Sequence, residues 1–161
     1  MSKLTVIDRQ EYILQGEFER IKAPERTILD ENNVILAVQK FKEEVVDLGL
    51  GLGTLNDGFL TIPTEYGDQV YEEDKEPAFM ILSVYWDSDK GAICGTIIIL
   101  DNDEGNKVKA AIDQGVECFM SASETDSYED MDKESGRILY KICDIKGYKL
   151  SLFNFKSTVN L

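Results

Sequence analysis

The feature that most constrains the fold is a pair of apolar segments in the middle of the chain, joined by a short polar turn. Residues 79–86 and 92–100 are rich in β-branched and aromatic side chains, and residues 87–91 (Asp-Ser-Asp-Lys-Gly) separate them. This pattern predicts two antiparallel strands with a tight turn between them. Two more strands are predicted at 138–145 and 148–155, on either side of Lys146-Gly147. A chain with two such hairpins is expected to build an antiparallel sheet.

Two helices are predicted beside these strands. Apolar side chains recur at helical spacing after Asp30, which predicts one helix over roughly 33–47 that stops at Gly49. Its apolar stripe consists of Val34, Val38, Phe41 and Val45. A shorter helix is predicted after residues 101–103, with Gly115 just past its end. A buried strand is then expected over 116–121.

The remaining segments complete a single domain over 1–161. Residues 12–21 are strand-like, and the glycine-rich segment 49–54 is interpreted as a turn into a strand, since it lacks the Lys-Ser/Thr ending of a phosphate loop. Residues 63–76 are predicted to form a mobile loop, and the acidic segment 124–134 a solvated one. The expected class is α+β, with a mostly antiparallel, barrel-like sheet and a few helices.

The charge of the chain narrows its possible partners. A net charge of −14 disfavours nucleic acid and anionic membranes, and it favours a protein partner with a basic surface. The three cysteines have no metal-ligand spacing, so buried thiols are expected, with no metal and no cofactor. No apolar run approaches the ~20 residues that span a bilayer, and no signal peptide is evident. We therefore expect the protein to act in a cytoplasm or in a particle assembled there.

One segment of the chain suggests an origin in a catalytic site. Residues 115–123 (Gly-Val-Glu-Cys-Phe-Met-Ser-Ala-Ser) are similar to the nucleophile segment of a serine protease family, with Ser121 at the nucleophile position. The chain contains no histidine, although histidine is the usual base for a serine nucleophile.

The order of motifs from about Tyr12 to Phe155 resembles the prohead core proteases of tailed bacteriophages of the contractile-tail type, a family related in fold to the herpesvirus protease assemblin. The helix 33–46 with residues 53–57 (Gly-Thr-Leu-Asn-Asp) is similar to the family's helix and its Gly-Glu-Leu-Asn-His block. The strands around Trp86 and Gly95 are similar to the hairpin between the family's catalytic residues.

Three later blocks continue this resemblance. Residues 105–111 followed by Gly115 are similar to the family's short helix, and residues 120–123 (Met-Ser-Ala-Ser) fall where the family has Val-Ser-Ser-Arg. Residues 147–150 (Gly-Tyr-Lys-Leu) match its late Gly-Phe-Lys-Leu strand. The resemblance implies an assemblin-like fold and contacts with capsid or scaffold chains.

The same alignment implies that the catalytic groups are replaced. The family's histidine falls at Asp57, its arginine beside the oxyanion site at Ser123, and its second serine at Ala122. A carboxylate with an ordinary pKa near 4 is a feeble base for a serine hydroxyl at neutral pH. A lysine base is the other route, and the candidates are Lys90, Lys107, Lys109 and Lys141.

The sequence therefore predicts a catalytically inactive relative, in which Ser121, Asp57 and Ser123 are vestigial. The expected role is that of a structural or assembly component of a phage virion, in contact with capsid, scaffold or tail proteins; self-association stays open. The expected location is the virion, or the host cytoplasm during assembly. Two alternatives remain: an active maturation protease with an altered dyad at Ser121, and a phage-encoded binder of a host protein. The acidic segment 124–134 is a candidate to cover the former substrate cleft or to form the contact with a partner protein.

Overall fold

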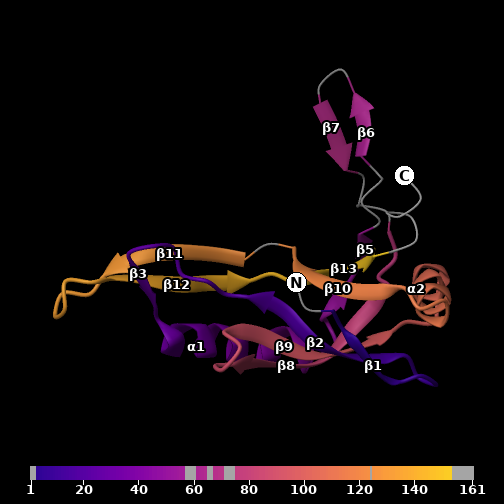
Figure 1. Cartoon of the computed structure of the whole chain (residues 1–161), viewed down its shortest axis with the longest axis horizontal. Helices are drawn as coiled ribbons and strands as arrows, with labels where there is room; N and C mark the ends of the chain where they lie inside the picture. Colours follow the sequence, from indigo (N-terminus) through magenta and orange to yellow (C-terminus); the bar gives the residue numbers. More distant parts are fainter. Residues whose placement is uncertain (1–2, 57–60, 65–66, 71–74, 124, 154–161) are drawn as a thin grey trace.

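The structure is a computed structural model that describes residues 3–56, 61–64, 67–70, 75–123 and 125–153, with the backbone alone at 61–64 and 67–70. The described part is mostly β, with two α-helices (Figure 1). Its largest sheet has five strands in the order β1-β2-β9-β8-β4, all antiparallel. These strands are β1 (Thr5–Asp8), β2 (Ile13–Arg20), β9 (Ala92–Ile99), β8 (Phe79–Asp87) and β4 (Leu52–Gly53).

Two three-stranded sheets lie on the other side of the core from this five-stranded sheet. The first has the order β10-β13-β5 and consists of β10 (Glu117–Ala122), β13 (Tyr148–Phe153) and β5 (Leu55–Asn56). The second has the order β11-β12-β3 and consists of β11 (Thr125–Met131), β12 (Ile138–Ile145) and β3 (Thr27–Leu29). In each, two antiparallel strands carry a short parallel one at the edge.

The fourth sheet is the hairpin of β6 (Thr61–Thr64) and β7 (Gly67–Val70), which stands away from the other sheets in Figure 1. None of the four sheets closes on itself within the described ranges. The predicted α+β class with antiparallel sheets is confirmed, whereas a closed barrel is not found among these strands.

Both predicted helices are present, and side chains cap their first turns. Helix α1 (Glu31–Phe41) begins after Asp30, whose carboxylate accepts a hydrogen bond from the Asn33 amide at 3.2 Å. It continues directly into a π-helical turn, η1 (Lys42–Val46), before Gly49 at a φ of 71°. Helix α2 (Asp103–Asp113) begins after Asn102, whose side-chain oxygen accepts from the Gly105 amide at 2.7 Å.

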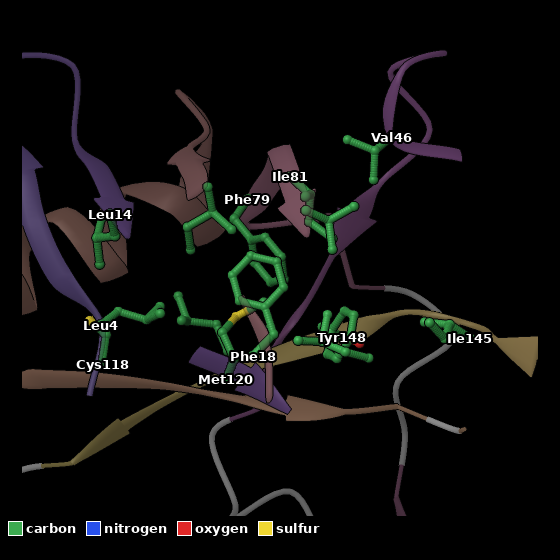
Figure 2. Packing of buried hydrophobic residues seen from close by; sticks show 14 of the residues in the cluster. Leu4, Leu14, Phe18, Val46, Phe79, Ile81, Cys118, Met120, Ile145 and Tyr148 are labelled. Atoms are coloured by element: carbon green, nitrogen blue, oxygen red, sulfur yellow. The ribbon is translucent and has the colours of Figure 1, made fainter. Parts of the chain in front are cut away.

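The core lies between the five-stranded sheet and the β10-β13-β5 sheet, and α1 packs between β8 and β12 of the third sheet. Figure 2 shows Phe18 and Phe79 from the large sheet in the same apolar cluster as Tyr148 of β13. The rings of Phe18 and Tyr148 have centroids 5.3 Å apart, and Phe41 of α1 meets the same tyrosine at 6.0 Å. Burial of these large side chains fixes the distance between the two layers.

Two predicted loops are strands in part. Most of the acidic segment 124–134 forms β11, which pairs with β12 along its whole length. Its charge does not prevent pairing because β11 is an edge strand with an exposed surface, and Lys141 and Lys146 neutralise Asp130 and Asp126 at 3.5 and 3.4 Å. The predicted mobile loop 63–76 contains the ends of β6 and all of β7, and its residues 65–66 and 71–74 lie outside the described residues.

Candidate functional site

Ser121 lies near the end of β10, where it is half-buried. Its neighbours Met120 and Cys118 turn into the core, so Ser121 belongs to the alternate set of side chains on the opposite face of the strand. Directly across the antiparallel ladder stands Lys149 of β13. Residues opposite one another in such a ladder project to the same face, so the serine hydroxyl and the lysine share one side of this sheet.

A pocket of about 280 Å³ opens beside Ser121, between β10 and β2. Its walls are residues 120–122 on one side and residues 17–20 on the other. The pocket is therefore built by two strands of different sheets, which the common core holds next to each other. The prediction of a strand over 116–121 is confirmed by β10, although the strand runs to Ala122 and only Cys118 and Met120 in it are buried. The neighbouring strand could not be identified from sequence.

Carboxylates dominate the electrostatics of this pocket. Glu19 accepts hydrogen bonds from the Tyr148 hydroxyl at 3.1 Å and from the Thr125 hydroxyl at 3.0 Å. Burial raises the pKa of Glu19, and the two hydrogen bonds oppose that shift. Glu17 also lines the pocket and forms an ion pair with Arg20 at 3.1 Å. A developing oxyanion here would meet negative charge rather than the donors that stabilise it.

The hydroxyl of Ser121 has no hydrogen-bond partner among the described residues. Ser123, at the predicted position of the family's arginine, is exposed, and its amide donates to the Gly147 carbonyl at 2.9 Å. Asp57 lies outside the described residues. The residue before it, Asn56, ends β5, which belongs to the same three-stranded sheet as β10. The sheet thus brings the segment that leads to Asp57 within two strands of Ser121.

The four lysines considered as bases are engaged elsewhere or lie outside the pocket beside Ser121. Lys107 pairs with Glu104 at 3.3 Å and Lys109 with Asp101 at 3.9 Å, both at helix α2. Lys141 pairs with Asp30 and Asp130 at 3.7 and 3.5 Å, and Lys90 lies in the turn between β8 and β9. None of the four lines the pocket beside Ser121.

Sequence reasoning missed Lys149 and the carboxylates of residues 17 and 19. The tight turn at Lys146-Gly147 predicts a strand that contains Lys149. Placing this lysine opposite Ser121, however, requires the register of β10 against β13. Pairing between strands that are about thirty positions apart leaves no local trace in the sequence.

No cofactor or metal site stands out near this pocket. Within the described ranges, no group of three or more cysteine, aspartate or glutamate side chains is arranged to hold a metal ion. No helix in the same ranges is long and apolar enough to cross a bilayer.

The chain was compared with protein families, curated proteins and solved structures. No family model matches the chain, and no curated protein matches it. Among solved structures, the match shows that the chain has a phage prohead-protease-like fold. One similar structure is that of the bacteriophage T4 capsid assembly protease, gp21, with a TM-score of 0.52 over 86% of this chain and 80% of that one. The sequence identity is 16%, so the likeness concerns the fold, and the predicted resemblance in fold is confirmed.

Proposed function

We propose that the chain is a catalytically inactive, prohead-protease-like domain that serves as a structural or assembly component of a phage particle. The fold likeness to a capsid assembly protease supports the connection with phage assembly. We infer the lack of catalytic activity from the environment of Ser121. Its hydroxyl has no partner in the described part of the chain, carboxylates line its pocket, and the whole sequence contains no histidine.

A serine hydroxyl needs a base to accept its proton and donors to stabilise the oxyanion, and loss of one such element costs orders of magnitude in rate. Here Glu17 and Glu19 supply negative charge, while the cation of the pocket, Arg20, is paired with Glu17. A domain that has lost its catalytic activity still offers surfaces that bind partner proteins. The net charge of −14 suits a basic surface on a capsid, scaffold or tail protein.

The test is a cleavage assay with purified capsid and scaffold precursors, run beside Ser121→Ala. We expect no cleavage by either protein and no labelling of Ser121 by a serine-directed phosphonate. Cleavage by the native chain that Ser121→Ala abolishes would overturn the proposal. Mass spectrometry of purified particles tests the structural role, for which we expect this chain in the virion. Absence from the virion would favour the binder of a host protein instead.

One observation favours an active protease as the second candidate. Lys149 stands directly opposite Ser121 in the ladder, on the same face of the sheet, as a serine–lysine dyad would require. If this dyad works, Lys149→Met abolishes precursor cleavage as completely as Ser121→Ala, while Lys133→Met, an exposed lysine in the turn after β11, leaves it intact. Equal, undetectable cleavage by all of these proteins supports the inactive domain.

A further inference from the structure

Strand β8 has a backbone edge that is only partly covered. β4 pairs with Phe79 and Met80, and the carbonyl of Gly51 accepts from the Ile81 amide at 2.8 Å. From Leu82 to Asp87, no described strand pairs with β8 on that side, since β8 is followed in its sheet only by β4. An uncovered edge of this kind offers backbone donors and acceptors to another extended chain.

A groove of about 600 Å³ runs along this edge, between β8 and the helix α1 with its η1 turn. Figure 1 shows α1 beside the β8–β9 hairpin, at the side of the molecule away from α2. The walls are apolar at Ile35 of α1 and at Val84, Tyr85 and Trp86 of β8. Ile35 and Tyr85 are more than two-fifths exposed, so this part of the groove presents apolar surface to solvent.

The charges at the groove are negative and fixed in place. The Glu31 carboxylate accepts from the Trp86 indole nitrogen at 2.8 Å, and the Glu43 carboxylate accepts from the Gln39 amide at 3.1 Å. Neither glutamate forms an ion pair with a described residue. The lysine of the groove, Lys42, is paired with Asp47 at 2.9 Å. The groove therefore carries two oriented carboxylates and one lysine, and because that lysine is paired with Asp47, negative charge is in excess.

We propose that this groove binds an extended segment of a partner protein, which adds a strand to the β8 edge at residues 82–87. The uncovered edge requires an extended backbone, the apolar walls favour apolar side chains at alternate positions, and Glu31 and Glu43 favour lysine or arginine between them. The proposal rests on the proposed function and deepens it, because it names the surface and the partner chemistry through which an assembly protein would act.

A second copy of this chain fits the groove less well. Pairing of two β8 edges would bring Glu31, Glu43 and Asp87 of one copy near the same residues of the other, between molecules that each carry a net charge of −14. Like charges placed together at an interface disfavour association. The occupant is therefore a basic, extended segment of a different protein.

The sequence contains one tryptophan, Trp86, so its fluorescence reports on the groove alone. The probe is the capped peptide Val-Lys-Val-Lys-Val-Lys-Val, titrated into the full chain at low ionic strength. We expect a saturable change in Trp86 fluorescence that weakens as salt is added. A peptide with glutamate in place of lysine is expected to give no change.

Backbone methylation separates strand addition from simple charge attraction. In one peptide, the backbone nitrogens that face β8 are methylated, which removes the hydrogen-bond donors, and we expect binding to be lost. In a second peptide, the other alternate set of nitrogens is methylated, and we expect its affinity to change by less than about twofold. Glu43→Gln keeps the oxygen that accepts from Gln39 but removes the charge, and we expect about threefold weaker binding. Glu129→Gln, an exposed position on β11, is the matched control with unchanged binding.

Equal binding by both methylated peptides, or equal weakening by Glu43→Gln and Glu129→Gln, would overturn the proposal. So would a concentration-dependent change in Trp86 fluorescence without peptide, accompanied by a dimer in sedimentation, since a second copy would then occupy the edge. These outcomes are independent of the cleavage assay and of the presence of the chain in particles. Failure of the groove therefore leaves the proposed function standing, and failure of the proposed function leaves the peptide result standing.

Discussion

Glu19 shows at the scale of one residue how the pocket beside Ser121 contributes to the fold. Its carboxyl group is held between Tyr148 and Thr125, and burial raises its pKa. A raised pKa in the folded state means that the native protein holds the proton more strongly than the unfolded chain. The stability from Glu19 is therefore present at low pH and is lost as pH rises through its folded pKa.

Glu19→Gln should therefore gain stability relative to the native sequence as pH rises, because glutamine has no proton to lose and still accepts a hydrogen bond. We expect the difference in the free energy of unfolding to shift in favour of the variant between about pH 4 and about pH 7. Urea unfolding at both values measures it, with the exposed Glu129→Gln as control. A difference that does not change with pH would contradict this account.

The cysteines differ in reactivity for a similar reason. Cys94 and Cys118 are buried, and burial raises the pKa of Cys94 and raises that of Cys118 to about 11, while Cys143 is exposed. Because the thiolate is the nucleophile, we expect a maleimide to label Cys143 rapidly and the other two only in denaturant. Mass spectrometry of digested protein locates the label. Rapid labelling of Cys118 in the native protein would show that β10 opens readily.

Gly95 of β9 sets the packing at the scale of elements. A methyl group at this position would meet the Ser83 carbonyl of β8 and the Phe18 ring of β2. We expect Gly95→Ala to destabilise the protein by about 1–3 kcal/mol through overpacking, as measured by thermal or urea unfolding. Ser127→Ala on the exposed surface of β11 should change stability little. An equal effect of the two substitutions would mean that the two strands separate easily at Gly95.

Elements with a strong local pattern were predictable, and those that depend on distant pairing were not. The stripe of α1, the turn of the β8–β9 hairpin and the caps of α2 are local, and each prediction is confirmed. β3 and β5 are two or three residues long and exist through parallel pairing with β12 and β13. The strand β11 was hidden by its acidic composition. At the site, Ser121 was found from a motif, whereas Lys149 and Glu19 required the three-dimensional register.

The excess of negative charge acts at the scale of the whole molecule. The ion pairs with Lys3, Lys42 and Lys146 lie on exposed surface and contribute little, so repulsion among the remaining carboxylates should dominate. We expect the midpoint of thermal unfolding to rise as sodium chloride is added, because salt screens this repulsion. Circular dichroism at several salt concentrations measures it. A fall in the midpoint would indicate that the surface ion pairs outweigh the repulsion.

The parallel edge strands have a consequence for how the chain is made. β3 cannot pair until β12 exists, β5 waits for β13, and the amide of Leu4 bonds to the Cys118 carbonyl. Contacts between such distant positions slow folding, since a long loop must close before they form. During synthesis, β3 and β5 therefore emerge from the ribosome well before the strands that pair with them. Until β12 and β13 emerge, these two edge segments lack their partners, and unpaired strand edges are prone to aggregation.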